Sequence, residues 1–212
     1  MPRPTRSSTH PIGVDASARR LLASLGDRPD AYLVGIAGIP GSGKSTLCAA
    51  VRGLVPDTAV VPMDGYHIPR RRLDAEGLRR RGAPHTFDAA AFRADIESLR
   101  QTREGVFPAF DHAEADPRPG AIRVTPAVPF VLVEGLYVLM RDWQLEPLFD
   151  LTVFLDCDPD VATERVAARH LAAGLAATPD LARARALAND RINALAILAD
   201  GCRERADLVL QS

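Results

Sequence analysis

The chain has almost no lysine. Lys44 is its only lysine, so 25 of its 26 basic residues are arginine, and 27 acidic residues balance them. This near-zero net charge excludes a bulk attraction to nucleic acid or to an anionic membrane surface, so any site for a polyanion must be local. Aromatic residues make up only 5% of the chain, and only Tyr66 lies near its arginine-rich stretch, which argues against nucleic-acid binding through stacked bases.

Cysteine is also scarce. Cys48, Cys157 and Cys202 are far apart and form no CxxC pair, which gives no support to a disulfide framework or a zinc site. The first ten residues, MPRPTRSSTH, are followed by no apolar run that would serve as a signal peptide or a membrane span. We expect residues 1–12 to be a frayed terminus, with an organelle address as the alternative, and we expect a reduced, cytoplasmic setting.

Short apolar runs alternate with helical patterns along the chain. Five runs have the β-branched content of fully buried strands: 31–37, 59–63, 129–135, 151–156 and 207–210. Helices are expected at 15–25, 45–55, 89–103, 159–173 and 179–199. This order predicts a single α/β domain over residues 1–212, with a three-layer, doubly wound, mostly parallel sheet.

Two segments do not fit this alternation. Residues 64–88 are crowded with arginine, glycine and proline, and residues 106–126 are rich in proline. We expect both to be irregular insertions that form small lids or flaps. Long irregular segments inside a compact domain are more often functional than idle, so both are candidate parts of the site.

The segment GIPGSGKS matches the GxxxxGK[ST] pattern of a P-loop, directly after an apolar strand and directly before a helix. We expect ATP to bind Gly38, Ile39, Pro40, Gly41, Ser42, Gly43, Lys44, Ser45 and Thr46. Backbone amides and the positive helix N-terminus would face the phosphates, and Ser45 would bind Mg²⁺. Lys44 would place a compact ammonium between the β- and γ-phosphates, where a planar guanidinium is too wide. The alternative is a glycine-rich turn with a solvated lysine.

Two carboxylates are expected beside this loop, because ligands of open α/β sheets bind at the carboxyl ends of strands. Glu134 ends the apolar run FVLVEG, and it would hold Mg²⁺ directly or through water; the alternative is a carboxylate that faces solvent. Asp64 follows the strand AVVPM and would orient an acceptor hydroxyl in line with the γ-phosphate. Its alternative role is that of a turn-forming aspartate before Gly65.

A set of motifs in one order resembles the phosphoribulokinase and uridine kinase family of P-loop kinases, pantothenate kinases included. These are GIPGSGKST, MDGYH, GAPHTFD, PAFDHAEADP, VEGLYVL and NDRINALAI, and they are most similar to a bacterial subgroup labelled nucleoside/nucleotide kinase-like or fructose transport system kinase. The resemblance implies a P-loop nucleoside triphosphate hydrolase fold and transfer of a phosphate from MgATP to a nucleoside, a pantothenate-like acid or a sugar such as fructose. It assigns catalysis to Asp64, the Mg²⁺ to Glu134, and the acceptor to Asp111 and His112.

Further positions are expected around the acceptor. Tyr66 and His67 belong to the motif MDGYH and are candidates for acceptor contact. Phe87 would either form a wall of the acceptor pocket or be a simple core residue. Asn189 and Asn193 are four residues apart on one helical stripe, from which their amides would reach the acceptor or the adenine.

Two arginines are candidates for the lid. Arg165 and Arg169 are four residues apart, so both lie on one face of their helix. They would either close over the transferring phosphate as catalytic residues or form exposed ion pairs with Glu164 and Asp160.

Six arginines lie at 70–72 and 79–81. They would either recognise an acceptor that already carries phosphate or form a solvated flap. The pattern as a whole favours a metabolite kinase whose partner is a small-molecule alcohol, with no nucleic acid and no membrane; a homodimer is left open. The alternative is a P-loop regulator that binds or hydrolyses nucleotide without an acceptor, although no guanine-reading NKxD motif is present.

Overall fold

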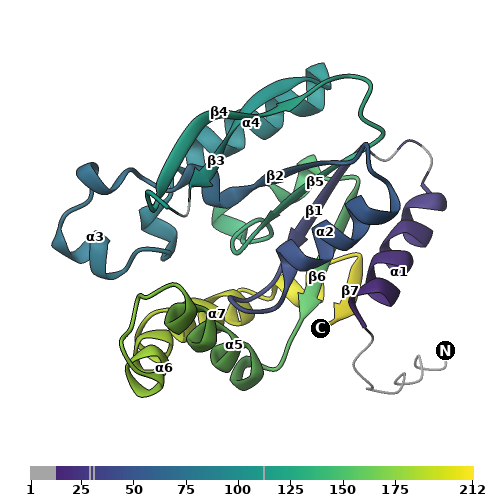
Figure 1. Ribbon diagram of the computed structural model, residues 1–212. Helices are drawn as coiled ribbons and strands as arrows, with labels where there is room; N and C mark the ends of the chain where they lie inside the picture. The colour runs from purple at the N-terminus through teal and green to yellow at the C-terminus, as the bar shows by residue number, and fades with distance from the viewer. Residues whose placement is uncertain (1–12, 29, 31, 112) are drawn as a thin grey trace.

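The fold is built around a sheet of five parallel strands, seen in a computed structural model (Figure 1). The structure describes residues 13–28, 30, 32–111 and 113–212, so the terminus expected at 1–12 and the candidate His112 lie outside the described residues. The strands lie in the order β2 (Ala59–Pro62), β5 (Val131–Gly135), β1 (Leu33–Ala37), β6 (Leu151–Asp156) and β7 (Leu208–Gln211). Because β1 is central, the connections run outwards to both sides, and the predicted doubly wound sheet is confirmed.

The three central strands are the most buried. Every residue of β1 and β5 is buried, and so is every residue of β6 except Asp156. Full burial was also expected for β2 and β7, and there it is wrong, because each lies at an edge of the sheet with one neighbouring strand. The difference in burial follows from the number of neighbouring strands, which the apolar composition of a short strand does not reveal.

Helices cover both faces of the sheet. They are α1 (Val14–Gly26), α2 (Lys44–Leu54), α3 (Ala75–Arg79), α4 (Ala89–Thr102), α5 (Pro159–Ala172), α6 (Pro179–Ala188), α7 (Asp190–Ala199) and α8 (Cys202–Arg205). On one face, Leu21 of α1 and Val51 of α2 pack with Ile36 of the sheet. On the other face, Phe92 of α4 and Ile197 of α7 belong to a second apolar cluster. No helix in the described part of the chain is both long and apolar enough to cross a membrane.

The proline-rich segment is a β-hairpin, which corrects the expectation of an irregular segment at 106–126. Strand β3 (Gly105–Asp111) pairs antiparallel with β4 (Asp116–Val124), beside α4 (Figure 1). The ladder accepts Pro108 because the pairing shifts register there. A two-stranded ribbon leaves one side of each strand without a neighbour, and proline is tolerated on such free edges.

The other segment contains short turns of helix, namely η1 (Met63–Tyr66), η2 (Arg70–Arg72), α3 and η3 (Pro84–Thr86). The long helix expected at 179–199 is also corrected, because it is divided into α6 and α7 at Asn189, whose backbone is not helical (φ −128°, ψ −63°). The Asn189 side chain donates instead to the carbonyl oxygen of Arg81 at 2.8 Å. This contact between distant segments outweighs the local helical preference of the alanine-rich sequence.

Candidate active site

The phosphate loop connects the end of β1 to the start of α2. Gly41 and Gly43 adopt a left-handed backbone, with φ of 81° and 90°. A Cβ on Gly41 would also collide with the carbonyl oxygen of Ala162 in α5, so only glycine fits this position. The buried residues of the loop are Gly38, Ile39, Pro40, Ser42 and Lys44. A tight glycine-containing loop at a helix N-terminus is a site that binds phosphate.

Lys44 is buried at the first position of α2. Its Nζ donates to the carbonyl oxygen of Gly38 at 2.9 Å and to that of Ile39 at 3.1 Å. Burial lowers the pKa of Lys44, and the negative charge of Glu134 acts in the opposite direction. The ammonium is therefore held against the loop backbone with few competing water contacts, which suits a point charge that meets phosphate.

Ser45 and Glu134 form the candidate magnesium position. Ser45 Oγ donates to Glu134 Oε1 at 2.9 Å, and Glu134 is only 8% exposed. Burial raises the pKa of Glu134, which the nearby charge of Lys44 opposes. Hydroxyl and carboxylate oxygens are the ligands that Mg²⁺ takes, and a buried carboxylate needs such a cation. Among the described residues, no three His, Cys, Asp or Glu side chains form a group that could hold a metal ion.

Asp64 lies in η1, directly after β2 at the same end of the sheet. Its side chain is exposed, and its negative charge acts on both Lys44 and Glu134, which places the three groups near one another. Next to it, a Cβ on Gly65 would overlap the carbonyl oxygen of Pro108, so the hairpin packs directly on this turn. The hairpin therefore fixes the position of Asp64 beside the phosphate loop.

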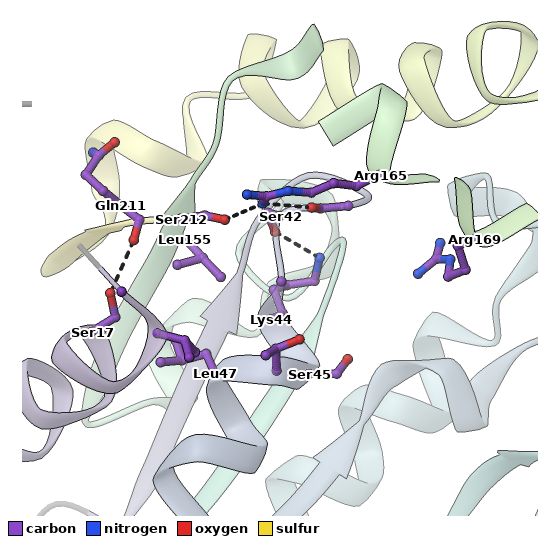
Figure 2. Close-up of a pocket in the computed structure, with 15 residues that line it drawn as sticks. Ser17, Ser42, Lys44, Ser45, Leu47, Leu155, Arg165, Arg169, Gln211 and Ser212 are labelled. Atoms are coloured by element: carbon purple, nitrogen blue, oxygen red, sulfur yellow. Dashed lines mark hydrogen bonds between the residues drawn. The ribbon is translucent and has the colours of Figure 1, made fainter. Parts of the chain in front are cut away.

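A pocket of about 580 Å³ opens above the loop (Figure 2). Its lining includes Gly41, Ser42, Gly43, Lys44, Ser45, Thr46, Arg165 and Arg169. Arg165 Nη1 donates to Ser212 Oγ at 2.6 Å and to the carbonyl oxygen of Gly41 at 3.4 Å.

The acidic residues that Arg165 and Arg169 were expected to pair with, in their alternative role, pair with other arginines. Glu164 pairs with Arg183, and Asp160 pairs with Arg191. Arg165 and Arg169 instead face the pocket together with Lys44.

Asn189 and Asn193 donate hydrogen bonds to backbone carbonyl oxygens rather than facing an open pocket. Asn189 donates to the Arg81 carbonyl oxygen, and Asn193 donates to that of Gly82 at 3.1 Å. The hydroxyl of Tyr137, which follows β5, also donates to the Gly82 carbonyl oxygen, at 2.6 Å. Three side chains thus hold one turn of the arginine-rich segment against α7.

The remaining candidates lie between η1 and the hairpin. The His67 ring contacts the rings of Phe87 and Phe110, at centroid distances of 4.0 and 4.9 Å, and its Nδ1 lies 2.8 Å from the Asp64 carbonyl oxygen. Burial lowers the pKa of His67, which keeps the ring neutral at neutral pH. Phe87 is buried and belongs to the main apolar cluster.

Tyr66 and Asp111 have local partners. The Tyr66 hydroxyl donates to Asp95 Oδ2 of α4 at 2.7 Å. Asp111 Oδ1 accepts from the backbone amides of Ala113 and Glu114, so this side chain shapes the hairpin turn. The structure brings Asp64, His67 and Phe87 together, while Asp111 lies at the tip of the hairpin.

Sequence reasoning missed two groups of residues at this site. Tyr137 had no signal beyond its place after a strand, and Arg81 was considered only as part of a cluster. The C-terminal Gln211 and Ser212 line the pocket because β7 is the neighbour of β6, and Ser17 Oγ donates to the Gln211 carbonyl oxygen at 3.2 Å. Their place depends on the order of strands in the sheet.

A doubly wound parallel sheet with this loop, a strand-end glutamate and a lid of arginines defines a P-loop kinase. Residues 33–173 match the sequence profile of the phosphoribulokinase / uridine kinase family, and the chain belongs to that family.

Named relatives agree on the class. A Schizosaccharomyces pombe protein named "putative uridine kinase" is 38% identical over 179 residues, which cover 76% of this chain and 75% of that protein. The ATP-dependent kinase YFH7 of Lachancea thermotolerans is 32% identical in an alignment 224 positions long, which covers 84% of this chain and 64% of that protein. The crystal structure of a "putative fructose transport system kinase" from a Silicibacter species is 36% identical with a TM-score of 0.79, covering 93% of this chain and 98% of that chain. All three names describe a kinase, and they give no common acceptor.

Proposed function

We propose that the protein transfers the γ-phosphate of MgATP to a hydroxyl of a small metabolite in the cytoplasm. The observation that carries the proposal is the hydrogen bond between Ser45 and Glu134, because it joins the phosphate loop to a buried carboxylate beside Lys44. The family supports ATP as donor, and the names of the relatives supply uridine and fructose as acceptors to test.

Each residue has a role that its position supports. The loop amides and Lys44 would bind the β- and γ-phosphates, and Ser45 with Glu134 would hold Mg²⁺, which neutralises charge on the phosphates when it is bound. Asp64 would accept a hydrogen bond from the acceptor hydroxyl and orient it, and later take its proton. Arg165 and Arg169 would stabilise the negative charge of the transferring group from the lid.

The test is a coupled assay of ADP release over a panel of alcohols that includes uridine, fructose and pantothenate, with the rate without acceptor as control. Asp64→Asn is expected to lower acceptor-dependent turnover by about 100-fold or more, because it removes the base that orients the hydroxyl, while ATP affinity stays within about threefold. Asp74→Asn is the matched control, because Asp74 only caps α3 and asparagine caps equally well. An ADP-release rate that no alcohol increases would contradict the kinase proposal and favour a nucleotide-dependent regulator.

A further inference from the structure

Arg81 is an unusual member of the arginine cluster. Its side chain is 15% exposed, and Nη2 donates to Asp116 Oδ1 of the hairpin at 2.8 Å. Its Nε and Nη1 are buried and have no hydrogen-bond partner in the described part of the chain. Buried donors without partners are costly, and proteins keep few of them. Two such donors on one guanidinium therefore indicate a site for a ligand.

The backbone of Arg81 is fixed from the opposite side. The donors from Asn189, Asn193 and Tyr137 all end on the carbonyl oxygens of Arg81 and Gly82. The guanidinium is thus bound to the hairpin through Asp116, while the backbone carbonyl oxygen of Arg81 is bound by Asn189. An arginine that is fixed at both its backbone and its side chain is arranged in advance for a ligand, unlike one that moves freely in solvent.

A chain of contacts connects Arg81 to the candidate catalytic residue. The Cζ of Arg81 lies 5.7 Å from the centroid of the Phe110 ring, and the ring of His67 also contacts Phe110. His67 in turn contacts the backbone of Asp64. The charge of Arg81 also acts on His67, as does that of Asp64, so both charged groups lie near the imidazole. An acceptor whose hydroxyl faces Asp64 would extend past His67 towards Arg81.

The surrounding charge favours an anion. Among the six arginines of 70–72 and 79–81, the only ion pairs in the described part of the chain join Arg79 to Glu76 and Arg81 to Asp116. The positive charges therefore exceed the negative ones within this segment of the described chain. Asn189 Oδ1 is also buried and has no hydrogen-bond partner among the described residues.

We propose that the phosphate acceptor is an anionic metabolite, whose carboxylate or phosphate binds Arg81 while its hydroxyl faces Asp64. This proposal rests on the proposed kinase function and names its substrate class. It divides the acceptors by charge: neutral uridine and fructose would be poor substrates, and hydroxy acids or sugar phosphates would be good ones.

The experiment compares matched acceptors in the ADP-release assay, with the phosphorylated product identified by mass spectrometry. The pairs are panthenol and pantothenate, ribitol and ribonate, fructose and fructose 6-phosphate, and uridine and uridine 5′-monophosphate. The carboxylate pairs and the phosphate pairs distinguish the two sources of negative charge. We expect kcat/KM for the anionic member of at least one pair to exceed that of its neutral partner by about tenfold or more.

Variants separate recognition from a structural role of Arg81. Arg81→Ala is expected to lower kcat/KM for the anionic acceptor by about 10- to 100-fold and that for its neutral partner by less than about threefold. Arg81→Lys keeps the charge without the planar fork and is expected to give an intermediate loss. Arg19→Ala is the control, because Arg19 is an exposed arginine of α1 outside the cluster, and it should leave both values unchanged.

Three outcomes of these assays decide whether Arg81 binds an anionic acceptor. A selective loss of the anionic substrate in Arg81→Ala supports the proposal. Equal losses for both members of a pair, or a neutral member that is the better substrate of the unaltered enzyme, overturn it and leave the kinase function standing. A rate that no acceptor raises contradicts the kinase function itself, and this proposal with it.

Discussion

Ser45 and Glu134 are 89 positions apart in the chain, and their side chains are joined by a hydrogen bond of 2.9 Å. The pairing of β1 with β5 brings these two side chains together. Ile36 of β1 lies opposite Glu134 of β5, and the phosphate loop begins two residues after Ile36. The register of two parallel strands thus places a carboxylate beside the first turn of α2. One residue of slip would turn the Glu134 side chain to the other face of the sheet.

Replacement of Glu134 by glutamine tests the magnesium position. We expect the Mg²⁺ concentration for half-maximal turnover to rise by about 10- to 100-fold, because a neutral amide binds the cation and its water less strongly. The melting temperature without Mg²⁺ should stay equal or rise, since a buried carboxylate is removed. Asp156→Asn is the control, because Asp156 ends strand β6, on the other side of β1, and pairs with Arg203 instead. Unchanged Mg²⁺ dependence of Glu134→Gln would contradict the assignment.

Replacement of Lys44 by arginine tests the significance of the single lysine. A guanidinium is too large for the position between the Gly38 and Ile39 carbonyl oxygens, so turnover at saturating ATP should fall by about 10²- to 10³-fold. The reverse exchange, Arg52→Lys on the exposed side of the same helix, should change turnover by less than about twofold. A Lys44→Arg enzyme with near-normal turnover would show that any cation serves there.

Replacement of Gly65 by alanine tests the packing of the hairpin on the Asp64 turn. The new Cβ would overlap the Pro108 carbonyl oxygen, and relief of this overlap is expected to cost about 1–3 kcal/mol in the free energy of unfolding. Turnover should fall as well, since Asp64 moves with the turn. Urea unfolding measures the first effect. Gly53→Ala in α2, where no atom lies within 4 Å of the new Cβ, should instead stabilise by about 0.4–1 kcal/mol. Equal stability of the two variants would contradict the packing argument.

Asp150 gives the fold a predictable pH dependence. Burial acts to raise its pKa, but hydrogen bonds from the amides of Leu33 and Tyr32, both at 2.9 Å, and from Arg100 outweigh it, so the pKa lies below its ordinary value. A carboxylate with a lowered pKa stabilises the folded state fully above the unfolded-state pKa of about 3.9. The contribution is lost as the pH falls through the lower, folded-state pKa.

Asp150→Asn should therefore lower the free energy of unfolding by about 1–3 kcal/mol at pH 7. The gap in urea midpoint between the two proteins should shrink below about pH 3.9. A gap that is the same at pH 7 and pH 3 would mean that the carboxylate charge contributes nothing.

Much of the fold could be predicted because its signals are local. The apolar runs of the strands, the helical spacing between them and the loop with Lys44 each depend on neighbours within a few residues. The errors arose where a distant contact overrode a local pattern. The helix break at Asn189 depends on Arg81, more than a hundred residues earlier, and the ribbon through Pro108 depends on the free edges of a two-stranded sheet.

The sequence by itself determined that a phosphate loop follows a buried strand, since one glycine-rich segment and a single lysine carry that chemistry together. Only the tertiary structure decided which of the six clustered arginines has buried donors without a partner in the described chain, namely Arg81 with its Nε and Nη1. The physical reason is that hydrogen bonds from α7, from Tyr137 after β5 and from the hairpin converge there. Such convergence depends on how the sheet and its insertions pack, and no short stretch of sequence records it.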